Sequence, residues 1–390
     1  MTLSRNNNRL LPKKGSNVIR YKKMLIGKIL FLLIFLITGA TFSGCVGLGG
    51  VPLGWSGIAI TDSSLFFGSM QGELVALHSN GNLLWEAPLE NSGSAGGFGC
   101  APGSTSVAIY GMPAVSGDLV YAGGYNGRLY LINANTRLSK DVYLDRDNPQ
   151  PIVGGPVIAQ GQVYIASSDG KLYALDDVSL NKKWEFPTGD KIWSTPAIYN
   201  DTLFIGSFDK KLYAINTNGS MKWEFSTQGA IVSTPLVYNN TVYVGSFDRY
   251  FYAIDATNGQ MKWKSQEVAE KWFWASPVAY NNTIYAPNLN GMVYIFDGSS
   301  GQQIDIIDLN SPISSSPVVI DGRVIVATEE GKIYSINTTD NLPRQLANLE
   351  EKIYAPISAS NGVIYIHTQK GILYEVDGQT GANRQLYQIT

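Results

Sequence analysis

The feature that most constrains the fold of this 390-residue chain is an internal repeat of about 40 residues. One marker is a tyrosine inside a Leu-Tyr-Ala-Ile-like run; it recurs at Tyr130, Tyr173, Tyr213, Tyr252, Tyr294, Tyr334 and Tyr374, with Val75 in the first copy. A second marker opens each unit with matching spacing, at Pro113, Pro156, Pro196, Pro235, Pro277, Pro317 and Pro356, with Gly57 in the first copy. Two independent markers therefore give eight units across residues 55–390, and such a period is typical of propellers and solenoids.

Each unit reads as four short β-strands. After Pro196, for example, residues 197–199 and 203–207 are rich in β-branched and aromatic side chains. In other units Asp-Gly, Asn-Gly or Glu-Gly pairs, at 169–170, 290–291 and 330–331, mark the hairpin turn into the third strand. Because no apolar stripe at helical spacing competes with this pattern, the sequence predicts an all-β fold. We expect an eight-bladed β-propeller of four-stranded antiparallel blades. The ring would close by packing of blade 1 against blade 8, without an exchanged strand.

A tryptophan recurs in the predicted fourth strand, at Trp85, Trp184, Trp223 and Trp263. A large flat side chain there can bury most of its surface as a wedge between neighbouring blades. The alignment puts other residues at this place in blades 6 to 8, namely Ile304, Gln345 and Gln385. We therefore expect weaker packing where the ring closes.

The N-terminal segment differs from the rest in charge. Residues 1–44 hold eight of the 29 basic residues and none of the 31 acidic ones, so residues 45–390 carry a net charge of −10. A basic stretch, the apolar run 29–37 and then small residues predict a signal peptide over residues 1–44 and an exported protein. An uncleaved anchor with a distorted span is the alternative, and Met24 is a second candidate start. The acidic remainder argues against a nucleic-acid partner.

The segment Phe42-Ser43-Gly44-Cys45 resembles the bacterial lipobox, in which the cysteine is lipidated and becomes the mature N-terminus; Phe42 stands where leucine is usual. The resemblance implies lipidation of Cys45 and attachment to the cell membrane or cell envelope, with residues 45–54 as a tether. The alternative is cleavage near Ala40, with Cys45 left as a free thiol. If Cys45 is lipidated, Cys100, in the glycine-rich insertion from Glu90 to Tyr110, stays a free thiol or pairs between molecules.

Three predicted connections between blades share an acidic-Lys pair followed by aromatic or apolar residues. They supply a candidate interaction face at one end of the propeller, made of Lys191, Trp193, Lys271, Trp272, Trp274, Lys352 and Tyr354. Exposed aromatic side chains beside lysines suit a protein contact or a stacked ligand. The alternative is that these side chains simply pack between blades.

The units resemble the PQQ-like propeller repeat. The resemblance rests on runs such as Ser315-Ser316-Pro317-Val318 and residues 242–259, and it covers residues 55–390. Eight such blades behind a lipobox are most similar to the BamB-type family of outer-membrane assembly lipoproteins. This implies a non-catalytic scaffold with protein partners of unknown identity and no cofactor. In a cell with one membrane, a surface binding protein is the alternative.

Quinoprotein dehydrogenases use a similar propeller, so a quinone- or metal-dependent oxidoreductase is the rival interpretation. Those enzymes often carry adjacent cysteines and a calcium site of carboxylate and amide groups, and this sequence has neither signature. Asp169, Asp209 and Asp248 recur at one repeat position, which favours turn capping. His78 and His367 fall at different repeat positions, and no triad, phosphate loop or metal-ligand spacing occurs. The sequence predicts no catalytic, cofactor or metal site.

Overall fold

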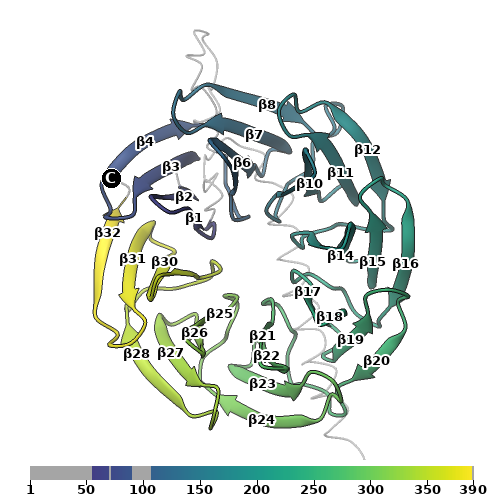
Figure 1. Cartoon of the computed structure of the whole chain (residues 1–390), viewed down its shortest axis with the longest axis vertical. Coiled ribbons are helices and arrows are strands. Elements are labelled where there is room, and N and C mark those ends of the chain that lie inside the picture. Colours follow the sequence, from purple (N-terminus) through teal and green to yellow (C-terminus); the bar gives the residue numbers. More distant parts are fainter. Residues whose placement is uncertain (1–54, 70–71, 90–106, 389–390) are drawn as a thin grey trace, which may run out of the picture. The chain divides into compact units, whose positions relative to one another are not determined.

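The computed structural model describes residues 55–69, 72–89 and 107–388. Within these ranges the chain forms eight four-stranded sheets whose neighbouring strands run antiparallel, set around a central axis as the blades of a propeller (Figure 1). The predicted all-β, eight-bladed propeller is confirmed. The predicted signal peptide (1–44), Cys45, the tether (45–54) and most of the insertion, Cys100 included, lie outside the described residues. The described ranges include no helix with the length and apolarity that a membrane span requires.

Each blade is built from four consecutive strands. Blades 1 to 4 consist of β1 (Ala59–Ile60), β2 (Ser64–Gly68), β3 (Glu73–His78), β4 (Leu83–Pro88); β5 (Ala114–Ser116), β6 (Leu119–Gly123), β7 (Arg128–Asn133), β8 (Ser139–Tyr143); β9 (Val157–Ala159), β10 (Gln162–Ala166), β11 (Lys171–Asp176), β12 (Lys182–Pro187); β13 (Ala197–Tyr199), β14 (Thr202–Gly206), β15 (Lys211–Asn216), β16 (Met221–Ser226). Blades 5 to 8 consist of β17 (Leu236–Tyr238), β18 (Thr241–Gly245), β19 (Phe251–Asp255), β20 (Met261–Lys264); β21 (Val278–Tyr280), β22 (Thr283–Pro287), β23 (Met292–Asp297), β24 (Gln303–Asp308); β25 (Val318–Ile320), β26 (Arg323–Ala327), β27 (Lys332–Asn337), β28 (Pro343–Asn348); β29 (Ser358–Ser360), β30 (Val363–His367), β31 (Ile372–Asp377), β32 (Asn383–Gln388).

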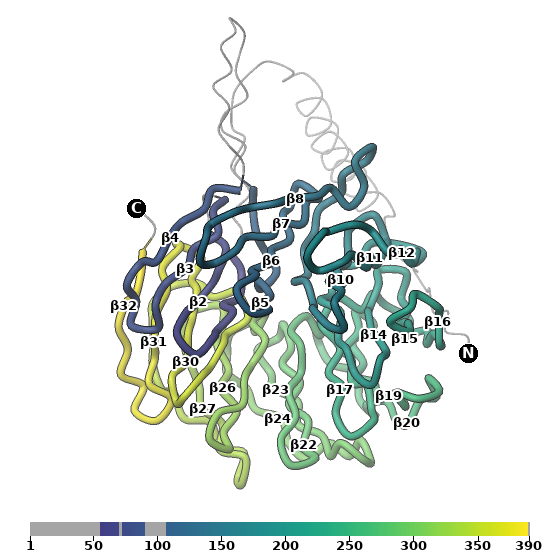
Figure 2. Tube along the Cα trace, turned by 45° about the horizontal axis from the view of Figure 1, so that its top comes forward, coloured from purple at the N-terminus to yellow at the C-terminus, as the bar shows by residue number. Residues whose placement is uncertain are grey.

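The first strand of each blade lies nearest the axis and the fourth lies at the rim (Figure 1). The ring closes where blade 8 meets blade 1, seen side by side in both views (Figures 1 and 2). There the Ser358 hydroxyl donates to the Ile58 carbonyl at 2.7 Å, and the Tyr387 hydroxyl donates to Glu86. No described strand is exchanged between the two blades, as the sequence predicts.

The core consists of apolar layers between blades. Successive side chains of a strand point to opposite faces of its sheet, so each blade buries both faces against its two neighbours. In β10, Val163 and Ile165 pack toward blade 2, whereas Tyr164 and Ala166 pack toward blade 4. This explains why the second and third strands read as almost continuous apolar runs.

The fourth-strand tryptophans are wedges, as predicted. Each indole N–H donates to a backbone carbonyl in the next blade, at 2.9 to 3.2 Å: Trp85 to Ala134, Trp184 to Thr217, Trp223 to Ala256 and Trp263 to Gly298. The rings also lie against the third turn of that blade, where a Cβ on Gly219, Gly259 or Gly301 would come within 2.8 Å of the indole. The indole therefore fixes the spacing between two blades by both a polar and a steric contact.

The sequence alignment of blades 6 to 8 is wrong by one residue at this place. By strand register, the residues that match the tryptophans are Asp305, Arg344 and Arg384, not Ile304, Gln345 and Gln385. In blades 7 and 8 the cause is a shifted β-bulge, which comes after this position and leaves Leu346 or Leu386 as the extra residue.

The proline that marks the start of each repeat is also displaced by one residue, relative to the first strand, in two blades. Six prolines directly precede their first strands, but Ile357 and Ile58 hold that place in blades 8 and 1, one residue after Pro356 and Gly57.

Candidate interaction face

One end of the propeller carries the connections between blades together with the hairpins that join second and third strands. We call this end the connection face; the opposite end, with the other two turns of each blade, is the turn face. The two kinds of loop on the connection face are bonded to each other. The Phe208 amide donates to the Lys191 carbonyl at 2.9 Å, and the Gln369 amide donates to the Lys352 carbonyl at 2.8 Å.

The predicted lysines lie on the connection face with exposed side chains. Lys191, Lys271 and Lys352 are all exposed, and none forms an ion pair with another described residue. Their backbone carbonyls, by contrast, are held by the neighbouring hairpin; the Asn288 side chain, for example, donates to the Lys271 carbonyl at 3.0 Å. The backbone of each connection is thus fixed while its ammonium group stays available to a partner.

Trp193, Trp272 and Trp274 join two phenylalanines in one group, which we call the aromatic cluster: Trp193, Phe208, Phe247, Trp272 and Trp274. Phe247 stacks on Trp272, with ring centroids 4.5 Å apart and an interplanar angle of 15°. Trp193 lies edge-on to Phe208 at 4.6 Å and to Trp274 at 6.2 Å. Because these rings come from blades 4, 5 and 6, the cluster is a continuous patch across three blades.

The cluster is open to solvent. Trp272 is 48% exposed and Trp274 is 37% exposed, while the other three rings are half-buried. The residue between the two tryptophans behaves differently: Phe273 is buried and lies against Gly245 of blade 5. Packing between blades therefore accounts for Phe273 but not for Trp272 and Trp274.

Tyr354 does not reach the aromatic cluster. Its ring lies 5.0 Å from Trp55, which lies 5.2 Å from Tyr110, and Tyr110 lies 5.3 Å from Tyr125. These four residues form a second group, over blades 8, 1 and 2. The predicted face is thus divided into two aromatic groups.

Five of these rings were not identified from the sequence. Trp55 and Tyr110 hold the same register position as Trp193 and Tyr354, three residues before the one that directly precedes the first strand. This shared position in the repeat could have identified Trp55 and Tyr110 from the sequence. Tyr125, Phe208 and Phe247 come from hairpins, and only their contacts in space show their role.

Basic and acidic side chains both border the aromatic cluster, and the exposed Asp190 and Glu270 directly precede Lys191 and Lys271. Lys210 and Arg249 follow Phe208 and Phe247 in their hairpins and are exposed, as are Lys191 and Lys271. The two aspartates of the same hairpins are held by hydrogen bonds from tyrosine hydroxyls. Asp209 accepts from Tyr213 at 2.6 Å and Asp248 accepts from Tyr252 at 2.7 Å.

Those aspartates, with Asp169, are turn-capping residues. Asp169 accepts from the Lys171 amide at 2.9 Å and from the Tyr173 hydroxyl. Burial and the hydrogen bond to Asp209 together raise the pKa of Tyr213, so its phenol stays protonated and keeps donating. The repeated aspartate therefore ties the hairpin to its own third strand, as expected from the sequence.

The two histidines lie in different environments. His78 is exposed at the end of β3. His367 is fully buried at the junction of blades 8 and 1, where its Nδ1 lies 3.1 Å from the Ser56 carbonyl. Since a carbonyl only accepts, Nδ1 carries the proton of the neutral ring. Burial lowers the pKa of His367 to about 4.

The described residues do not fit a quinone and calcium site. Among them, no three His, Cys, Asp or Glu side chains gather as metal ligands would. The recurring aspartates are each bonded to turn amides and a tyrosine.

Fold and repeat define an eight-bladed propeller of the PQQ-like class. A family model described as "Outer membrane protein assembly factor BamB" matches residues 101–194 and 183–387. Because the matched residues cover most of the chain, the chain belongs to this family.

Individual relatives are more distant. The outer membrane protein assembly factor BamB of Marinobacter adhaerens is 30% identical over 120 residues, a match that spans 28% of this chain and 27% of the relative. The crystal structure of BamB from Moraxella catarrhalis superposes with a TM-score of 0.68 at 18% identity, over 82% of this chain and 93% of that one. The crystal structure of the computationally designed Ika8 protein superposes with a TM-score of 0.70 at 14% identity, over 83% of this chain and 96% of that one. At such identities the structural matches support the fold alone.

Proposed function

We propose that this protein is a non-catalytic scaffold of the cell envelope that binds a protein partner through the aromatic cluster on its connection face. The observation that carries the proposal is the exposure of Trp272 and Trp274 within a five-ring patch that blade packing does not explain. Exposed tryptophans with flanking cations are typical of the residues that dominate binding energy in protein interfaces. Membership of the BamB family favours a role in envelope protein assembly.

The proposal includes export and attachment through a lipidated Cys45. A protein held at the membrane by acyl chains would present its propeller to partners in the same compartment. Mass spectrometry of the protein purified from its own membranes tests this part: a diacylated N-terminal Cys45 is expected, and an unmodified thiol would contradict it.

The partner contact is tested with two matched triple variants. One replaces the connection-face residues Trp193, Trp272 and Trp274 by alanine. The control replaces three exposed apolar residues placed elsewhere, Leu138, Val178 and Met261. Chemical cross-linking in the producing cells should give an adduct with one specific protein in the wild type and the control. The adduct should be lost in the tryptophan variant, and equal yields in all three would contradict the proposal.

A further inference from the structure

The joint between blades 7 and 8 lacks the tryptophan wedge. In blade 4, for example, Trp223 lies across the sheet from Phe204, with ring centroids 5.7 Å apart. The matching residues of blade 7, by strand register, are Arg344 and Ile325. Arg344 is exposed. In blade 7 the place of the two aromatic rings is therefore taken by the exposed Arg344 and by Ile325, which is buried in an apolar cluster against which Leu346 packs.

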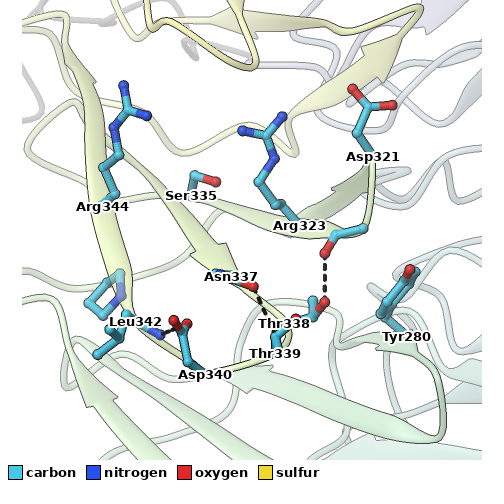
Figure 3. Close-up of a pocket in the computed structure, with 12 residues that line it drawn as sticks. Tyr280, Asp321, Arg323, Ser335, Asn337, Thr338, Thr339, Asp340, Leu342 and Arg344 are labelled. Carbon is cyan, nitrogen blue, oxygen red and sulfur yellow. Dashed lines mark hydrogen bonds between the residues drawn. The ribbon is translucent and has the colours of Figure 1, made fainter.

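A cavity of about 590 Å³ lies on the turn face at this blade (Figure 3). It is lined by the two turns of blade 7 and by residues of β26, β27 and β28, among them Arg323, Ser335, Asn337 and Arg344. An adjoining cavity of about 660 Å³ shares both arginines and Asp321, and adds Gln379 and Thr380 of blade 8. Both cavities thus meet at the arginine pair.

The two guanidinium groups extend to the same side of the blade, with Ser335 between them (Figure 3). Strand register explains this arrangement. Ser335 pairs with Arg344, and Arg323 pairs with Asn337, two residues along the same strand. All four side chains consequently point from one face of the sheet, toward blade 8.

Neither guanidinium group of this pair has a hydrogen bond or an ion pair with a described residue. Blade 8 shows the contrast. Arg384 holds the same register position as Arg344, but its cross-strand neighbour is Glu375, and the two form an ion pair. In blade 7 that neighbour is Ser335, which offers no charge.

The carboxylates nearby do not neutralise the pair by contact. Asp340 accepts from the Leu342 amide at 3.0 Å, and Asp377 accepts from the amide and hydroxyl of Thr380. The amide and hydroxyl of Thr380 lower the pKa of Asp377 most strongly, and the more distant Arg323 adds a small effect. Asp321 lines the cavity without an ion pair to either arginine.

We propose that this cavity is a binding site for a ligand that carries carboxylate groups, held by Arg323 and Arg344 and by the Ser335 hydroxyl. A guanidinium presents paired N–H donors that match the two oxygens of a carboxylate. Two such groups on one side suit an acidic peptide segment with neighbouring carboxylates. The site lies on the turn face, so it is independent of the proposed partner contact on the connection face.

Calorimetric titration with the peptide Ac-Glu-Glu-Glu-NH₂ tests the proposal. We expect binding at millimolar or lower concentration, and no binding of Ac-Gln-Gln-Gln-NH₂. Loss of a charged hydrogen bond typically weakens binding about tenfold or more, so Arg344→Ala and Arg323→Ala should each raise the Kd by that factor. Arg146→Ala, an exposed arginine of the connection between blades 2 and 3 that belongs to neither proposed site, should leave the Kd unchanged. Thermal unfolding of each variant checks that the fold is retained.

Three outcomes would overturn the proposal. One is the absence of triglutamate binding to the wild type at millimolar concentration. Another is an unchanged Kd in both Arg344→Ala and Arg323→Ala. The third is binding of inorganic phosphate in place of the peptide, which would make the cavity a phosphate site.

Discussion

The indole N–H of Trp223 in blade 4 donates a 3.2 Å hydrogen bond to the backbone carbonyl of Ala256 in blade 5. Beneath the same ring lies Gly259, where a Cβ would come within 2.7 Å of the indole. The contact recurs in four of the eight blades, so one type of joint holds half of the ring together. Its removal should therefore weaken the fold in a graded way.

Trp223→Ala should lower the free energy of unfolding by about 3–5 kcal/mol, since it removes a large buried ring and leaves a cavity. Trp223→Phe keeps most of the packing and loses the hydrogen bond, and should cost about 1–2 kcal/mol. Met221 lies in the same strand but is 52% exposed, so Met221→Ala is the matched control and should change stability by less than about 0.5 kcal/mol. Urea unfolding measures the free energy of unfolding of all three variants. Equal effects of the two Trp223 variants would contradict the role of ring packing in this joint.

Gly259→Ala should be more destabilising than Gly362→Ala. Both glycines have positive φ, +74° and +81°, but a Cβ on Gly362 meets no atom within 4 Å. Gly362→Ala therefore reports the backbone strain alone, about 1–2 kcal/mol. Gly259→Ala adds a clash with the Trp223 ring. Thermal unfolding of the two variants compares them, and equal shifts in Tm would show that the ring moves aside without cost.

His367 should make the fold sensitive to mild acid. Because burial lowers its pKa to about 4 in the folded state, the unfolded chain binds a proton at higher pH than the folded one. The stabilisation is present above the unfolded pKa of about 6.5 and is lost as the pH falls from there toward 4.

The expected loss is about 2 kcal/mol between about pH 7.5 and about pH 5. His367→Leu should reduce this pH dependence, and urea unfolding of both proteins at the two pH values measures the difference. An identical pH dependence would mean that His367 is protonated equally in the two states.

Blades 7 and 8 should open before blade 4 in native-state hydrogen exchange. Their joints carry Arg344 and Arg384 at the place of the tryptophan, and thus less buried aromatic surface. Amides of β31 should exchange faster than amides of β15. Equal protection of the amides in all eight blades would contradict this prediction. It would show that Leu346 and Leu386 stabilise their joints as well as the tryptophans do.

The sequence predicted the fold because the same four strands occur eight times, and chance cannot align two markers so often. The closure without strand exchange followed from the strand count. The residues that replace the tryptophans could not be predicted by counting, since a shifted bulge changes which residue faces the next blade. Arg344 and its cavity were missed for the same reason.

The candidate face was predicted in part. The lysines and tryptophans of the connections were recognisable as breaks in the repeat. Their grouping depends on the three-dimensional fold. Trp193 opens blade 4 and Trp274 opens blade 6, and the two rings approach each other because the matching position of blade 5 holds the smaller Val232. No sequence pattern shows that Phe247 of a hairpin stacks on Trp272 of a connection.

The central claim is that the aromatic cluster contacts a protein partner. A photo-cross-linking amino acid placed at position 272 in the producing cells tests it most directly, with position 178, which is 65% exposed on the turn face, as the matched site. The account predicts a specific protein adduct from position 272 and none from position 178. No adduct from position 272, or the same adduct from both positions, would contradict it.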